Sequence, residues 1–483
     1  MKRIYLLAAV LVSLNAVNAQ VSFRKMQNMI PRSKDGLNMF DVHKDDVEYD
    51  GLSVDLGGAF AMQFQALNSF NDQSEGTYTA SNGAAIAGAH NPDTGALTTS
   101  GYRLNNLANN FNLPAANLTV GAQLADGVRV NLDIYLSSRH HNETWVKGGF
   151  LQIDKLDFIK KDFLADIMKY TTIKIGQMEN NYGDAHFRRT DNGNALLNPF
   201  VEANIMDSFE TEMGMEVYYN RQGLVSMIGI TNGKLNQGVA EFIPAAPTAN
   251  APDPNTTVSP TILAKLGYDK QLNEDLRVRI TGSYNHNANM SANPWGSDRA
   301  GSRYFGVMSH QAYSYDPSPG GSNSTAEIAN NFDPTSNATT GRFSPGYANW
   351  YTAFMINPFV KFKGLEFFGT LEFTEGGDKK GTDASRKVDQ YAADLVYRFG
   401  KSEQFYVGAR YNTVSGNISS QTQKVSVDRF ESSLGWFMTK NIIAKLSYTN
   451  QNYKDYAQYS GNSLNDFYGG SFEGLMFEAA ITF

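Results

Sequence analysis

The sequence predicts an all-β protein, a transmembrane antiparallel β-barrel of 16 strands. Three observations support this fold class. Apolar residues recur at every second position in sixteen separate stretches, which is the period of a strand with one apolar face. Short turns and long polar loops alternate between these stretches, as in barrels whose short turns face the periplasm. Aromatic residues gather at the strand ends, where amphipathic rings meet the two surfaces of a bilayer.

Composition and charge exclude some classes of protein. The chain has 483 residues with a formal net charge of −7, which argues against a nucleic-acid partner. It contains no Cys, as suits an oxidising compartment where stray thiols are a liability. No shift in composition divides the chain, although a soluble chain of this length usually splits into domains.

The N-terminus carries a targeting pattern. Two basic residues precede an apolar run from Ile4 to Val12, and Val17 and Ala19 occupy the −3 and −1 positions of a cleavage site. We therefore expect residues 1–19 to be a secretory signal peptide. No later run reaches 18 apolar residues, so we expect no transmembrane helix.

The mature chain is expected to have two parts. Residues 20–50 are polar and charged without a clear period, and we interpret them as an N-terminal periplasmic segment. Residues 51–483 would form the transmembrane barrel. A signal peptide followed by such a barrel indicates the outer membrane of a Gram-negative type of cell, with outer-membrane lipids as partners.

Sixteen strands follow from the period of two. Most have about the ~9–11 residues that a tilted strand needs to cross a bilayer. Within one of them, Pro358 removes a hydrogen-bond donor, so we expect a bulge there. The last strand ends on Phe483 and must pair with the first to close the barrel. The predicted strands are 52–66, 117–124, 128–137, 145–154, 171–179, 211–220, 224–232, 261–269, 276–285, 351–362, 365–375, 388–399, 404–413, 425–437, 442–450 and 473–483.

Two connections depart from plain turns and loops. Residues 155–170 form a long segment where a short turn is due, and their apolar residues have helical spacing, which predicts a small helix at the periplasmic mouth. The third long loop, 180–209, is both charged and apolar. Within it, Asn198 followed by Pro199 predicts the start of a short helix.

The third loop is the candidate for a constriction. Its residues alone leave two interpretations open: the loop folds against the inner wall and narrows the pore, or it folds on the rim. Its charged and ionisable candidates are Asp184, His186, Arg188, Arg189, Asp191, Glu202 and Asp207.

The polar faces of the strands supply the predicted pore wall. A barrel of sixteen strands is too wide for side chains to fill, so it holds water unless something plugs it. Basic and acidic residues are nearly balanced on these faces, and mixed charge does not select one ion sign, so phosphate selectivity is not supported. The predicted wall residues are Arg129, Lys265, Arg277, Arg279, Lys361, Glu212, Glu216, Glu366 and Glu372.

Two stretches resemble a known family. "GGAFAMQFQALN" (57–68) and "GDAHFRRTDNGNALLNPFVEANIMDSFETE" (183–212) are similar to outer-membrane porins of Bacteroidota, which are distantly similar to phosphate-selective porins. The loop pattern and the terminal Phe resemble the trimeric sixteen-stranded general porins. This resemblance implies an inward-folded third loop that forms the constriction. It also implies a homotrimer and a water-filled channel for small polar solutes and ions. From the dense charge of the loop we further expect Arg188 and Arg189 to face acidic groups across the gap.

Other function classes remain as alternatives. A channel specific for one class of solute, such as anions or phosphate, would use the same fold. A barrel hydrolase would need a paired His, and the cluster "RHHNE" (139–143) stands alone without a GxSxG, HExxH or Walker pattern. A surface adhesin would use the polar loop 286–350. We expect no enzyme, no cofactor and no metal site.

Overall fold

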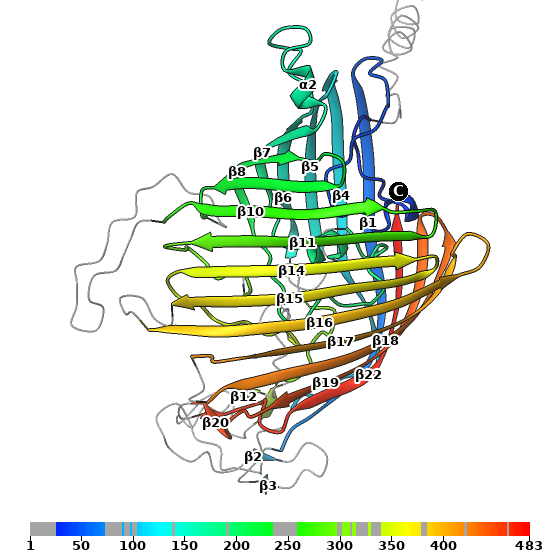
Figure 1. Ribbon diagram of the computed structural model, residues 1–483. Coiled ribbons are helices and arrows are strands. Elements are labelled where there is room, and N and C mark those ends of the chain that lie inside the picture. The colour runs from blue at the N-terminus through cyan, green and yellow to red at the C-terminus, as the bar shows by residue number, and fades with distance from the viewer. Residues whose placement is uncertain are drawn as a thin grey trace, which may run out of the picture.

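The computed structural model shows a closed antiparallel barrel whose strands wind side by side around one lumen (Figure 1). None of the helices among the described residues is long and apolar enough to cross a membrane. The structure describes residues 26–72, 89–90, 97–98, 104–137, 141–189, 193–234, 258–296, 302–309, 312–314, 327–329, 340–377, 384–419, 423–460 and 463–483. The predicted signal peptide, 1–19, lies outside them.

Sixteen strands form the barrel, each paired with its neighbours in sequence, and the last pairs with the first. The prediction of sixteen strands is confirmed, and the ends differ by up to seven residues, the largest difference being the start of β4. The strands are β1 (Ser53–Phe70), β4 (Asn110–Ala125), β5 (Val128–Ser137), β6 (His141–Ile153), β7 (Thr171–Glu179), β8 (Thr211–Tyr219), β9 (Leu224–Thr231), β10 (Thr261–Gln271), β11 (Leu276–Asn287), β14 (Tyr351–Phe362), β15 (Leu365–Gly377), β16 (Ser385–Phe399), β17 (Phe405–Gly416), β18 (Val425–Thr439), β19 (Ile442–Lys454) and β22 (Ser471–Thr482).

Among the described residues, three short two-stranded sheets lie in the long connections between barrel strands. They pair β2 (Ala89–His90) with β3 (Leu97–Thr98), β12 (Ala312–Ser314) with β13 (Glu327–Ala329), and β20 (Tyr459–Ser460) with β21 (Ser463–Leu464). At the end with the short turns, the predicted helix of 155–170 is confined to one turn, α2 (Ala165–Met168).

The two faces of the barrel are inverted relative to a soluble protein. On β16, Tyr391, Leu395 and Tyr397 point outward and are 42%, 51% and 52% exposed. Inward residues of the same strand, such as Asp394 and Arg398, are both only 2% exposed. An apolar exterior with a charged interior suits a barrel that lies in lipid and encloses polar groups.

Aromatic rings form a continuous row on the outer face at the short-turn end. Tyr397 and Phe399 stack with ring centroids 6.0 Å apart, and Phe399 and Phe405 follow at 5.7 Å. Phe405 then stacks on Trp436 at 6.2 Å. These rings lie at the level where an interfacial girdle is expected.

The barrel closes between its first strand, β1, and its last strand, β22. The backbone N–H of Phe483 donates to the carbonyl of Gly58 at 2.9 Å, and the N–H of Gly58 donates back at 3.0 Å. The ladder continues from Ala59 opposite Thr482 to Phe70 opposite Ser471. The predicted pairing of the last strand with the first is therefore confirmed.

The bulge predicted at Pro358 is wrong. Pro358 lies opposite Ile280 in an unbroken register with β11. On the β15 side the pairs stop at Ile356 and resume at Phe359 without a change of register. An added Cβ at Gly369 would lie 2.8 Å from Cγ of Pro358, so this glycine leaves room for the ring and the strand stays straight.

Candidate functional site

The candidate site is the lumen, and other parts of the chain partly fill it. One is the third loop, residues 180–209, which lies between β7 and β8 and is described except for 190–192. Another is the N-terminal segment, residues 26–45. The described parts of the connection between β11 and β14 also contact the inner wall. The lumen therefore has to be analysed as a wall plus these inserted segments.

The first half of the third loop is fixed by a buried charge cluster. Asp184 accepts hydrogen bonds from Lys265 at 3.2 Å, from Nε of Arg279 at 2.7 Å and from Thr281 at 2.7 Å. Burial alone raises the pKa of the Asp184 carboxyl, but the charges of Lys265 and Arg279 outweigh burial and hold this pKa below its usual value. Asp184 is therefore an ionised anchor, and three inward residues of β10 and β11 hold it.

The second half is held through its backbone. Nζ of Lys445, on β19, donates to the carbonyls of Ala195, Asn198 and Phe200 at 2.7, 3.1 and 3.1 Å. The same ammonium lies 2.6 Å from the carboxylate of Glu478 on β22. One buried cation thus satisfies three carbonyls that no helix satisfies.

Glu202 joins the third loop to the β11–β14 connection. Its carboxylate accepts from the Ser302 hydroxyl at 2.8 Å, from the Arg303 N–H at 2.5 Å and from Arg342 at 3.1 Å. Burial raises the pKa of Glu202, but the charges of Arg342, Arg429 and Arg303 outweigh burial and lower this pKa to about 2. Glu202 therefore stays ionised near neutral pH.

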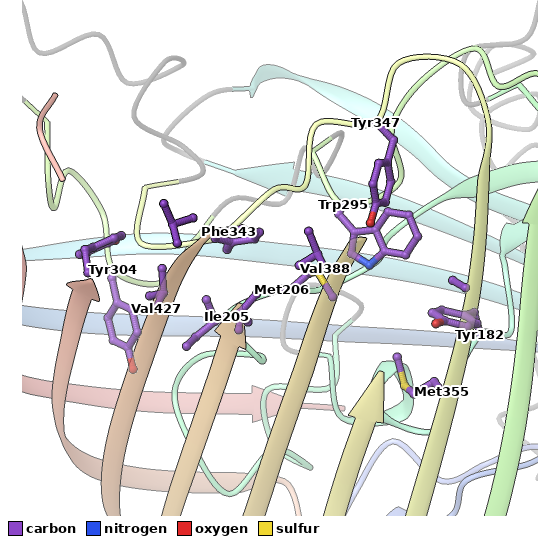
Figure 2. Close-up of a cluster of buried hydrophobic side chains, with 14 of the residues drawn as sticks. Tyr182, Ile205, Met206, Trp295, Tyr304, Phe343, Tyr347, Met355, Val388 and Val427 are labelled. Carbon is purple, nitrogen blue, oxygen red and sulfur yellow. The ribbon is translucent and has the colours of Figure 1, made fainter. Parts of the chain in front are cut away.

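An apolar cluster adds to the filling of the lumen, and its wall residues run from β8 around the barrel to β1. Side chains of the third loop meet aromatic residues of the β11–β14 connection and inward residues of the strands (Figure 2). This part of the barrel interior is thus packed with protein. The labelled residues of the cluster are Tyr182, Ile205, Met206, Trp295, Tyr304, Phe343, Tyr347, Met355, Val388 and Val427.

The helix predicted to start at Asn198 is wrong. The Asn198 side chain accepts from the N–H of Phe200 at 2.9 Å and donates to the carbonyl of Glu202 at 3.1 Å. The Asn198 side chain therefore stabilises a local turn instead of capping a helix, and the nearby backbone carbonyls bind Lys445. The loop's helical turn lies earlier instead, as the 3-10 helix η2 (Ala185–Arg188).

The two arginines of the third loop are buried and paired. Arg188 donates to the Asn38 side chain at 2.7 Å and lies 3.7 Å from Asp394 on β16. Arg189 forms an ion pair with Asp207 of the same loop. Arg188 is only 6% exposed and Arg189 1% exposed, so both act inside the packed part of the lumen.

His186 and Asp191 complete the set of candidates in the third loop. Nε2 of His186 lies 2.9 Å from Oδ1 of Asn181, and Nδ1 lies 3.6 Å from Glu179. Burial lowers the pKa of His186, so its ring is neutral at physiological pH. Asp191 lies outside the described residues.

The predicted acidic wall residues all accept hydrogen bonds from groups inside the barrel. Three of the four accept from the third loop or the N-terminal segment. Their negative charges therefore help to hold these two segments against the wall. The bonds run to Glu212 from Asn180 (2.9 Å), to Glu216 from the N–H of Asn181 (2.9 Å), to Glu366 from Asn38 (2.7 Å) and to Glu372 from Trp295 (3.0 Å).

The remaining basic wall residues are bound as well. Arg277 contacts Asp269 with two nitrogens, at 2.8 and 2.6 Å, in the paired geometry that suits a carboxylate. Lys361 lies 2.9 Å from Glu403. Arg129, by contrast, binds the neutral oxygen of Gln152 at 2.6 Å and faces a cavity.

That cavity has a volume of about 290 Å³ and lies on the side of β4 to β8. The third loop and residues 29–32 of the N-terminal segment cover it. Its lining is rich in amides and carries charges of both signs, so it favours polar contents without a strong preference for one sign. The charged residues of the wall strands are Arg129, Asp133, Lys147, Lys174, Glu179 and Glu216.

Two lining lysines were not among the predicted site residues. Nζ of Lys174 lies 5.3 Å from the ring centroid of Phe150 and 5.2 Å from that of Tyr218. Lys147 lies 4.7 Å from the ring of Tyr135. Strict alternation from the lining residues Gly148 and Phe150 would place Lys147 on the outer face. The pairing of β5 with β6 shifts register beside Asp133, and Lys147, the extra residue at this shift, lines the cavity as well.

Comparisons with known proteins gave matches among solved structures. No family model and no curated protein matches the sequence. The anion-selective porin from Comamonas acidovorans is similar in structure, with TM-score 0.47 and 11% identity over 89% of this chain and 100% of that one. Salmonella typhi OmpF, in a complex with daunomycin, is similar with a TM-score of 0.49 and 9% identity over 90% of this chain and 99% of that one. The outer membrane channel DcaP of Acinetobacter baumannii is similar with a TM-score of 0.44 and 9% identity over 90% of this chain and 99% of that one.

Proposed function

We propose that this protein is an outer-membrane porin, a channel for passive diffusion of small polar solutes and ions. The observation that carries the proposal is the pairing of an apolar outer surface with a polar cavity inside one closed barrel of sixteen strands. A barrel of this strand number has room for an aqueous path even after loops enter it.

In this proposal the third loop forms the constriction. Support comes from Asp184 and Glu202, whose ionised carboxylates are bound by groups of the wall and of the β11–β14 connection. The path for solutes then runs along the strands β4 to β8, past Arg129, Lys174 and His186. Arg188, Arg189 and Asp207 act by holding the loop, since their charges are already paired.

The proposal includes a location and an assembly. Residues 1–19 would direct export, the short turns would face the periplasm, and lipid would contact the outer aromatic row. We further propose a homotrimer, in which part of the apolar face packs on a neighbouring copy. A mass measurement in mild detergent tests this assembly, and a monomer at every concentration would contradict it.

The test of the function is single-channel recording. Purified, folded protein in a planar bilayer should give discrete conductance steps, and reversal potentials in a salt gradient should show weak ion preference. Vesicles that contain the protein should swell in small sugars and resist larger ones. A correctly folded barrel that adds no conductance would refute the proposal.

A channel specific for one solute class is the second candidate. The observation that favours it is the cavity of about 290 Å³ between the third loop and β4 to β8, whose size and polar lining suit a single small solute. Flux that saturates at low solute concentration would support this candidate. Flux that rises linearly with concentration would support free diffusion.

A further inference from the structure

The N-terminal segment crosses the short-turn mouth of the barrel. Side-chain and backbone contacts fix it in turn to the β4–β5 turn, the β18–β19 turn and the β6 end. A segment with contacts at such separate points spans the opening. The three contacts join Gln27 to Asp126 (3.0 Å), the Lys34 N–H to the Lys440 carbonyl (2.7 Å) and Lys44 to Asp154 (2.7 Å).

The middle of the segment enters the lumen at Phe40. This side chain is 2% exposed, and its ring centroid lies 5.2 Å from that of Phe359 and 5.7 Å from that of Phe368. The guanidinium carbons of Arg188 and Arg279 lie 5.3 and 5.4 Å from the Phe40 centroid. Aromatic packing and two cation–π contacts thus hold one residue against the inner wall.

Asn38 ties the segment to both the wall and the third loop. Its side chain donates to Glu366 of β15 at 2.7 Å and accepts from Arg188 of the third loop at 2.7 Å. Its carbonyl accepts from Arg277 of β11 at 3.0 Å. The same short stretch therefore contacts two strands and the loop.

Arg279 couples the two inserted segments directly. Nη1 of Arg279 lies 2.5 Å from Asp41 of the N-terminal segment, and Nε lies 2.7 Å from Asp184 of the third loop. Each segment therefore stabilises the position of the other through one shared guanidinium.

We propose that residues 26–45 are a second narrowing element of the channel, anchored by Phe40, and that they set the size limit for solutes together with the third loop. This inference rests on the proposed channel function. Residues Met29, Ile30 and Arg32 line the same cavity as the third loop, so the segment borders the path itself. A segment that only tied turns together would need its end contacts but no aromatic anchor inside the lumen.

The test compares three variants in bilayers and in vesicles. Phe40→Ala removes the anchor and leaves every residue of the barrel wall unchanged. It should raise conductance by about twofold and admit larger sugars, because the unobstructed lumen of a sixteen-stranded barrel is wide. Phe40→Leu keeps an apolar side chain but loses the ring contacts, so its conductance should lie between those of the wild type and Phe40→Ala. Phe367→Ala truncates an outward ring next to Phe368, 38% exposed, and should change nothing in the path.

The outcomes separate this inference from the function on which it rests. A folded wild type without conductance overturns both. A conducting wild type with the same conductance and size limit in folded Phe40→Ala overturns this inference alone. If Phe40→Ala does not fold, Asp41→Asn serves instead, because Arg279 keeps Asp184 as its partner. An unchanged size limit in that variant and in Lys44→Ala would likewise overturn the inference.

Discussion

The carboxylate of Asp184 in the third loop lies 2.7 Å from Nε of Arg279 on β11, and neither side chain is more than 1% exposed. Lys265 of β10 shares the same carboxylate at 3.2 Å. Asp184 therefore compensates Lys265 and part of the charge of Arg279, which also pairs with Asp41 and Asp269, and departure of the loop would take this anion away from both cations.

Loss of the Asp184 carboxylate should be costly. Asp184→Ala leaves Arg279 and Lys265 short of a partner, and we expect about 3–5 kcal/mol of lost stability, the range for breaking a buried ion pair. Urea unfolding in detergent, followed by tryptophan fluorescence, measures this change. The control is Lys440→Ala, because Lys440 and its partner Asp35 are both well exposed and such pairs contribute about 0–1 kcal/mol. Equal effects of the two variants would contradict the anchor role.

The attachment of the third loop should persist in acid. Glu202 has a pKa of about 2 in the folded protein against an ordinary value of 4.5, so it binds a proton more readily when unfolded. Its contribution is therefore complete above pH 4.5 and is lost as the pH falls towards 2, on the order of 3 kcal/mol in all. Protease cleavage within the loop should stay slow at pH 5 and rise only near pH 2. Glu202→Gln should remove this pH step, and loop release already at pH 5 in the wild type would refute it.

The β6–β7 pairing should not tolerate a side chain at Gly176. This residue has φ 142°, and an added Cβ would lie 2.4 Å from the Gly149 carbonyl oxygen. Gly176→Ala should therefore destabilise the barrel by about 1–3 kcal/mol. Gly282→Ala is the matched control, because the nearest atom to its new Cβ is 3.9 Å away. Thermal unfolding compares them, and equal melting temperatures would contradict the steric argument.

Lys174 should influence which ions pass. It lines the cavity with its ammonium between two rings, so Lys174→Gln removes a positive charge from the proposed path. We expect the reversal potential to move towards cation preference while the fold is kept. Lys363→Gln, at an exposed turn position, is the control and should leave the potential unchanged. A shift in the control alone would place the path elsewhere.

The strands could be predicted because one face of each strand meets the apolar exterior and the other meets the polar lumen, which imposes a period of two on the sequence. On β16 every second residue meets the outside, and the residues between meet the lumen, so the alternation survives along the whole element. Pro358 was harder to judge, since its tolerance depends on Gly369 across the ladder. Sequence alone does not reveal which strand residue will stand opposite.

The contents of the lumen could be predicted only in part. The mixture of charge and apolar residues in the third loop marked it as a segment that packs, but its carbonyls bind Lys445, which lies far away in sequence. The role of the N-terminal segment was missed, because a charged stretch without period gives no pattern to read. Within residues 26–45, Phe40 is the one apolar ring that could have signalled it.

The bond from Lys445 to the carbonyl of Ala195 spans 250 residues, which has a consequence for the order of folding. Contacts between such distant residues form late, because the chain between them must be arranged first. The third loop therefore cannot settle until β19, the last barrel strand but one, has joined the wall. A newly closed barrel would pass through a brief leaky stage, and the docking of the loop would end that stage.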